Sequence, residues 1–233
     1  MIYNVLAQYY DGLVKDNEAT KQWVNFIQKN IQGKAIMELA CGSGEITIAL
    51  AAEGYQIEAS DMSCAMIEEA CKKPGSNKVH FYTMDMNEFH SEKKQDGVLC
   101  LCDSINYLLE EKQLKSLFHN IYETLNEEGI FIFDMHTVDR LKEFEEEFYE
   151  EGVVAGHEYI WSIISEEDCL YHNFVFYDKE AHASQEQHIQ RVYDVSTINE
   201  LLCPYFDIEI YTDFDQKGIV PGEKYFYICR KKG

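Results

Sequence analysis

Short apolar runs and stretches of helical period alternate between residues 35 and 134. Apolar residues in 114–125 recur at i, i+3, i+4, i+7 and i+11, which predicts an amphipathic helix that ends at Gly129. Five runs predict strands: 35–40, 56–60, 79–82, 98–102 and 129–134. Strands that alternate with helices favour an α/β fold with a parallel sheet covered on both faces.

The pattern changes near residue 150. We expect 143–151 to be a solvated helix with Phe144 and Phe148 turned inward. Runs rich in Tyr, Phe, Ile and Val then predict an antiparallel β meander. These runs are 157–165, 170–177 and 188–195.

The alternation resumes after the meander, with a helix that Ser196 or Thr197 begins. The last two predicted strands, 206–211 and 225–230, are too close for a helical crossover and should pair antiparallel. We therefore expect one α/β domain built from 1–150 and 196–233, with an inserted β lid at 151–195. A helical cap at 1–32 precedes the first strand.

The chain is strongly acidic. Its 233 residues include 42 Asp and Glu against 20 Lys and Arg, a formal net charge of −22. Nucleic acids are bound largely through Lys and Arg, so a nucleic-acid partner is not expected. The charge favours a small-molecule partner.

Nothing in the sequence predicts export or membrane insertion. The N-terminus lacks a basic-then-apolar signal, and no apolar run reaches the length of about 18 residues needed to span a membrane. The eight cysteines include no CxxC pair or zinc-type spacing, so we expect no metal and a reducing, cytoplasmic location. Cys100 and Cys102 lie in an apolar run and are interpreted as buried, inert thiols.

Candidate chemistry gathers where the predicted strands end. The segment 38–44 (ELACGSG) joins the first strand to a helix; its glycines permit a tight turn, and the helix N-terminus offers free N–H groups to an anion. Asp61 and Asp85 follow the second and third strands. A single Asp at a strand end is commonly a turn former. Carboxyl ends of parallel strands share one sheet edge, however, which predicts a ligand site.

These segments resemble motifs of class I S-adenosylmethionine-dependent methyltransferases. Residues 38–44 are similar to motif I, (E/D)-x-x-C-G-x-G, and 101–107 resemble the motif IV segment. Residues 9–13 (YYDGL) resemble the lead-in of a bacterial subgroup of small methyltransferases, which has a three-stranded insertion after strand five. The resemblance implies a Rossmann-like, seven-stranded sheet with the last strand antiparallel, and S-adenosylmethionine as cofactor.

The resemblance also implies roles for individual residues. Glu38 would meet the ammonium of the methionine moiety, Asp61 the ribose, and Tyr10 would close over the cofactor. The cofactor-binding positions it implies are Tyr10, Glu38, Ala40, Cys41, Gly42, Asp61, Met62, Asp85, Met86 and Cys102. Met62, Asp85 and Met86 would bracket the adenine. Backbone at 40–42 would line the amino-acid end, and that of Cys102 would lie near the sulfonium.

Methyl transfer needs orientation above all, and a general base only if the acceptor arrives protonated. Asp103 and His136 follow strands four and five and are the candidates for such a base. A helix cap is the alternative for Asp103, and pocket lining or a structural hydrogen bond for His136. Residues 103–107 (DSINY) are not the Asn/Asp-Pro-Pro-Tyr signature of amide and adenine methyltransferases, and the acceptor atom stays open among O, N and C.

The insertion should wall the acceptor pocket, for which ordinary sheet packing is the alternative. Its candidate aromatic lining consists of Tyr159, Trp161, His172 and Tyr193. Arg191 is a candidate anchor for an anionic acceptor group, or else part of a structural ion pair.

Two other functions compete with methyl transfer. One is an NAD-dependent oxidoreductase, which Thr47 disfavours because it stands where the dinucleotide fingerprint has its third Gly or Ala. The other is a non-catalytic protein that binds S-adenosylmethionine.

Overall fold

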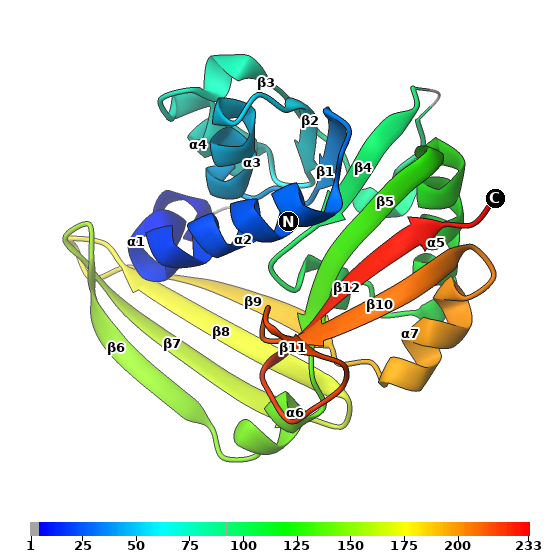
Figure 1. The fold of residues 1–233 in the computed structure, drawn as a ribbon. Helices are drawn as coiled ribbons and strands as arrows, with labels where there is room; N and C mark the ends of the chain where they lie inside the picture. Colours follow the sequence, from blue (N-terminus) through cyan, green and yellow to red (C-terminus); the bar gives the residue numbers. More distant parts are fainter. Residues whose placement is uncertain (1–4, 92) are drawn as a thin grey trace.

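The computed structural model describes residues 5–91 and 93–233. Its centre is an eight-stranded sheet of order β11-β10-β12-β5-β4-β1-β2-β3 (Figure 1). The strands are β1 (Ala35–Leu39), β2 (Gln56–Asp61), β3 (Val79–Thr83), β4 (Gln95–Cys100), β5 (Leu125–His136), β10 (Phe206–Thr212), β11 (Gln216–Lys217) and β12 (Lys224–Lys231). The main helices are α2 (Asn17–Asn30), α3 (Glu45–Ala52), α4 (Cys64–Lys72), α5 (Glu111–Thr124) and α7 (Val195–Leu202).

The sheet confirms the predicted fold class. β1 to β5 pair in parallel, and β12 lies antiparallel between β5 and β10. The two-residue β11 adds a short edge to the seven expected strands. Buried side chains from α2 and α3 pack on one face of the sheet, and those from α5 and α7 on the other. The sheet is therefore buried on both faces, as its near-continuous apolar strands predict.

The meander is also confirmed, and it gains a strand. β6 (Phe148–Val154), β7 (His157–Glu166), β8 (Cys169–Tyr177) and β9 (Ala183–Arg191) form a separate antiparallel sheet. The sheet begins at Phe148, three residues before the boundary expected at 151, and β9 begins before the expected residue 188.

The predicted helix at 143–151 is wrong. α6 covers only Asp139–Glu143, and residues from Phe148 onward pair with β7. Phe144 is buried as expected, whereas Phe148 is 39% exposed. Pairing with β7 supplies backbone hydrogen bonds and suits Phe, Tyr and Val, so it overrides the helical reading of the glutamates.

Three predicted ends move by a few residues. α5 ends at Thr124, so Gly129 lies inside β5 and does not end the helix. β4 ends at Cys100, which leaves Cys102 beyond the strand. α7 begins at Val195 with Asp194 at its N-cap, rather than at Ser196 or Thr197.

The N-terminal segment, η1 (Leu6–Gln8) and α1 (Tyr10–Val14), lies between the two sheets (Figure 1). Leu6 packs in a cluster with Val154 and Phe174 of the second sheet. Tyr9 stacks on Phe176 with 4.5 Å between ring centroids. Residues 1–4 of the expected cap lie outside the described part of the chain. In the part that is described, no helix is long and apolar enough to cross a membrane.

Candidate functional site

A cavity of about 640 Å³ lies at the carboxyl ends of β1, β2 and β4. All ten residues expected to bind the cofactor line it, from Tyr10 on α1 to Cys102 after β4. The volume falls within the range of small-molecule sites, about 300–1,000 Å³. The common sheet edge thus brings together residues that are up to 92 positions apart in the sequence, Tyr10 and Cys102.

The backbone at this edge is unusual. Ala40 (φ +52°), Gly42 (φ +56°) and Gly44 (φ +74°) follow β1, and Cys102 (φ +57°) and Asp103 (φ +54°) follow β4. Side chains disfavour this left-handed region, and such residues gather at functional sites. A Cβ at Gly44 would also lie 2.9 Å from Phe81 Cζ. Glycine is therefore required there by conformation and by space.

Asp61 holds the glycine loop in place. Its Oδ2 accepts a hydrogen bond from Gly42 N at 2.9 Å, and its Oδ1 accepts one from Ser63 N at 2.8 Å. Burial raises the pKa of Asp61 above its ordinary value, although the two backbone hydrogen bonds partly offset this effect. Each carboxylate oxygen can accept a further hydrogen bond. Asp61 thus has acceptor capacity left for ligand hydroxyls.

Glu38 provides the test of whether a cationic cofactor fits. Its side chain is 3% exposed and lines the cavity. Its Oε2 has no hydrogen-bond partner among the described residues, and burial raises the pKa of Glu38 to about 7. A buried carboxylate oxygen without a partner is costly. An ammonium group, which S-adenosylmethionine carries, would satisfy it, so the residues fit this cofactor.

A polar cluster fastens α1 over the glycine loop. Lys73 Nζ lies 2.6 Å from Asp11 Oδ2 and 2.7 Å from Glu45 Oε1, and it donates to Ser43 Oγ at 2.8 Å. Ser43 Oγ donates to Asp11 Oδ1 at 2.6 Å. Lys15 Nζ adds a 2.9 Å contact to Glu45. This latch keeps Tyr10 at the cavity.

Lys73→Met should therefore weaken S-adenosylmethionine binding about fivefold, because a partly exposed ion-pair cluster contributes about 1 kcal/mol. Calorimetry measures the affinity, and limited proteolysis at residues 5–15 should become faster. Lys72→Met, which removes an exposed pair with Glu69 on the same helix, is the matched control. Equal affinities for the two variants would show that the latch does not hold the site closed.

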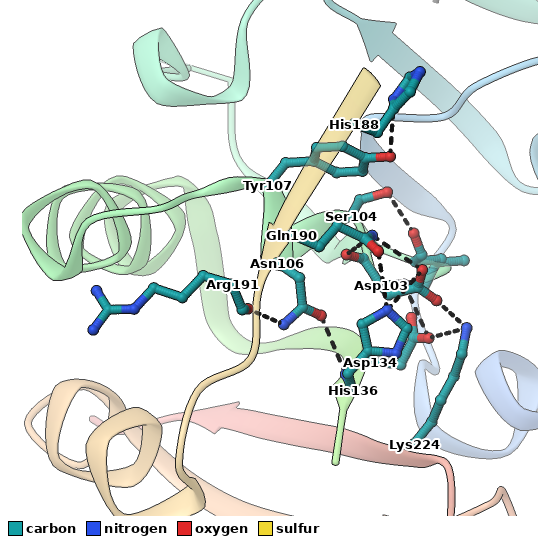
Figure 2. A network of polar contacts seen from close by, with 11 residues as sticks. Asp103, Ser104, Asn106, Tyr107, Asp134, His136, His188, Gln190, Arg191 and Lys224 are labelled. Carbon is teal, nitrogen blue, oxygen red and sulfur yellow. Dashed lines mark hydrogen bonds and ion pairs between the residues drawn. The ribbon is translucent and has the colours of Figure 1, made fainter. Parts of the chain in front are cut away.

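A second polar cluster joins the ends of β4, β5 and β12 (Figure 2). Lys224 contacts Asp103 Oδ1 and lies 3.3 Å from Asp134 Oδ2. His136 Nε2 lies 3.0 Å from Gln190 Oε1 and 3.5 Å from Asp103 Oδ2. Burial lowers the pKa of His136 below its ordinary value, although the nearby Asp103 carboxylate partly offsets this effect. Asp134 and Lys224 line the cavity, but neither base candidate, Asp103 nor His136, is among the lining residues.

Residues of the insertion reach the cavity at positions other than those expected. The aromatic lining proposed from the sequence is wrong, because Tyr159, Trp161, His172 and Tyr193 are not among the residues around the cavity. Trp161 instead stacks on Phe174, with 5.3 Å between centroids, as ordinary sheet packing requires. Gln187 and Ile189 of β9 line the cavity in their place.

Arg191 forms the structural ion pair. Its Nε donates to Asp168 Oδ2 at 2.7 Å, and its Nη1 to the Leu109 carbonyl at 3.0 Å. Its guanidinium also lies 4.7 Å from the Tyr193 ring centroid. The alternative of an anion anchor in the cavity is not supported, because Arg191 is not a lining residue.

Cys102 also corrects an expectation. Cys100 is buried in β4 as predicted, whereas Cys102 is exposed at the cavity. Lining residues that the sequence analysis did not single out include Trp23, Tyr107, Phe214, Lys224 and Phe226. Tyr107 lies in the segment that resembles motif IV, so the sequence already indicated that it is near the site. The others reach the site through long-range packing that no local pattern signals.

The family is shown by comparison with known proteins. A family model described as a methyltransferase domain matches residues 36–129. A Bacillus subtilis protein, "Putative methyltransferase YqeM", is 30% identical over 99% of this chain and 98% of its own length. A "Putative methyltransferase" from Geobacillus sp. is 29% identical over 99% of this chain and 100% of its own length.

A solved structure agrees. The S-adenosylmethionine-dependent methyltransferase from Clostridium acetobutylicum has a TM-score of 0.83 and 26% identity, with 99% of each chain covered. The fold and site thus define a class I methyltransferase. The chain belongs to this family of S-adenosylmethionine-dependent enzymes. Membership supports neither the NAD-dependent nor the non-catalytic alternative.

Proposed function

We propose that the enzyme methylates a small-molecule acceptor bound in the same cavity as S-adenosylmethionine. The observation that carries this proposal is the convergence of all ten expected residues on one cavity, which continues past Cys102 to Tyr107, Ile189 and Lys224. The cofactor supplies a methyl group already activated on a sulfonium. The chain's own work is to bind, orient and exclude water.

At the cofactor end, Glu38 accepts from the ammonium and Asp61 from the ribose hydroxyls. Backbone at 40–42 meets the carboxylate at the N-terminus of α3. Met62, Asp85 and Met86 surround the adenine. Support comes from the unpartnered Glu38 oxygen and from the fixed position of the Asp61 carboxylate.

The charge of the cavity as a whole favours an amine as acceptor. The cavity-lining residues include seven carboxylic acids and two lysines, and these charged residues are Asp11, Lys15, Asp16, Glu38, Glu45, Asp61, Asp85, Asp134 and Lys224. A cleft lined mainly by one sign of charge concentrates ligands of the opposite sign. We therefore propose a cationic or amine-bearing small molecule as acceptor. Release of S-adenosylhomocysteine across a panel of small amines, phenols and carboxylic acids tests this; turnover of the acids alone would contradict it.

Asp61→Ala should weaken S-adenosylmethionine binding more than about tenfold, because it removes charged hydrogen bonds to the ribose and to the glycine loop. Calorimetry measures the dissociation constant. Asp61→Asn retains one acceptor oxygen, so its dissociation constant should lie between those of the unaltered enzyme and Asp61→Ala. Unchanged affinity in Asp61→Ala would exclude the ribose role.

A further inference from the structure

A chain of polar contacts leads from the cavity to the N-terminal segment. Tyr107 Oη lies 3.3 Å from His188 Nδ1 (Figure 2). His188 Nε2 lies 3.3 Å from Glu186 Oε1, and these two side chains are 1% and 7% exposed. Glu186 Oε2 accepts hydrogen bonds from Val5 N at 3.1 Å and Leu6 N at 3.0 Å. The carboxylate, the imidazole and the phenol are thus arranged in series.

The carboxylate selects the tautomer of His188. An N–H at Nε2 faces Glu186, so the neutral ring presents a lone pair at Nδ1 to the Tyr107 hydroxyl. Burial raises the pKa of Glu186, but hydrogen bonds from His188 and from the backbone of Leu6 and Val5 lower it overall. Glu186 is therefore ionised and able to stabilise an imidazolium.

Two other neighbours of His188, His172 and Phe174, carry no positive charge. His172 lies opposite on β8, and burial lowers the pKa of His172 to about 4, so it is neutral. Phe174 contacts the His188 ring edge to face, with 5.6 Å between centroids. Glu186 is the charged side chain that contacts the His188 ring.

Tyr107 is the cavity end of the series. It closes η4 (Ser104–Tyr107) after β4 and lines the cavity, as do Tyr10 and Cys102. Burial raises the pKa of Tyr10, and Cys102 and Tyr107 raise it further, which places these three groups in one electrostatic neighbourhood. His136, by contrast, forms a hydrogen bond with Gln190 and does not line the cavity.

We propose that Tyr107, His188 and Glu186 form a proton relay that deprotonates the acceptor, an inference that rests on the proposed function. The acceptor X–H proton passes to Tyr107 Oη as the Tyr107 proton passes to His188 Nδ1. The freed lone pair on X forms the bond to the methyl carbon, and the electrons of the carbon–sulfur bond remain on the sulfur. The imidazolium is held by Glu186 until its proton returns to solvent.

The relay defines the acceptor as one whose nucleophile carries a proton to be lost, and the acidic cavity favours an ammonium. The relay also makes proton transfer depend on the docking of the N-terminal segment. Glu186 is a positioning residue because its second oxygen binds Val5 N and Leu6 N, so the N-terminal segment must be docked for the series to be complete.

Histidine ¹⁵N NMR on the complex with S-adenosylhomocysteine tests the relay without an identified acceptor. At about pH 8, above the ordinary histidine pKa, His188 should be the Nε2–H tautomer. Glu186→Gln should convert it to a mixture of tautomers. His172→Gln assigns the neighbouring signals and should leave the His188 tautomer unchanged. An Nδ1–H tautomer in the unaltered enzyme overturns the proposal.

Kinetics provide the second arm. With any amine or phenol that the panel shows to be methylated, Tyr107→Phe should lower kcat by about 10²-fold, the usual contribution of general acid–base catalysis. KM for S-adenosylmethionine should not change. Glu186→Gln should move the acidic limb of the kcat–pH profile to lower pH, a shift that a merely structural role would not produce. Retention of full kcat by Tyr107→Phe overturns the relay, whereas failure of the unaltered enzyme to bind S-adenosylmethionine contradicts the proposed function instead.

Discussion

Glu38→Gln should stabilise the protein against unfolding at about pH 8 and weaken S-adenosylmethionine binding by roughly 10- to 100-fold. Burial raises the pKa of Glu38 from 4.5 to about 7, so the folded protein holds this proton more tightly than the unfolded chain. Stability is therefore lost as pH rises from 4.5 to 7. Above that range the ionised side chain costs about 3 kcal/mol, which the neutral amide avoids.

Denaturant unfolding at about pH 8 and about pH 5 measures the first effect. The two proteins should differ by about 1–3 kcal/mol at the higher pH and much less at the lower, where the folded protein keeps Glu38 protonated and no buried charge remains. Glu18→Gln, an exposed acid on α2, is the matched control and should change neither property. Equal stability at both pH values, or undiminished affinity, would contradict the role of Glu38.

The sequence was sufficient for the parallel half of the fold. Strands β1 to β5 are short apolar runs, and helices separate all but β3 and β4, so each strand can be recognised within a short window. The cofactor end of the site follows from the same local signals. Glu38, the glycine loop, Asp61 and Asp85 lie at or just beyond the carboxyl ends of strands, and a parallel sheet necessarily brings such ends together.

The second sheet was harder to predict because pairing is not local. The glutamates before Phe148 suggested a helix, but β7 supplies the partner that makes β6 a strand. Alternation on β9 decides which side chains face the cavity: Gln187 and Ile189 line it, whereas His188, on the other face of the strand, contacts Phe174 and the Tyr107 hydroxyl. A shift of one residue would exchange the two sets.

Backbone strain was invisible for a different reason. Nothing in the identity of Ala40 or Cys102 signals a positive φ, and glycine or asparagine would be expected there. The surrounding sheet imposes these conformations on the ends of β1 and β4. Because strain of this kind is retained where surrounding structure over-determines it, it marks the cavity edge independently of the motifs.

Lys224→Met should destabilise the protein by about 3 kcal/mol, because it leaves the buried Asp134 carboxylate and the partly buried Asp103 carboxylate without their cation. Lys224 lies 121 positions from Asp103 in the sequence and contacts it, and it also lies 3.3 Å from Asp134. The Asp134 side chain is fully buried, and burial raises the pKa of Asp134 to about 6. Denaturant unfolding at about pH 7.5 measures the loss. Lys217→Met removes an exposed pair with Glu209 and should cost less than about 0.5 kcal/mol.

The pH dependence and a second substitution separate charge from packing. Burial raises the pKa of Asp103, but Lys224 and His136 lower it well below its ordinary value. Its contribution to stability is therefore present above about pH 4 and lost in more acidic solution. Asp134→Asn in the Lys224→Met background removes one of the unpaired charges and retains an oxygen for Asp103 N, so it should restore at least about 1 kcal/mol. If the double variant is no more stable than Lys224→Met alone, the lysine acts through the packing of its aliphatic stem and not through its charge.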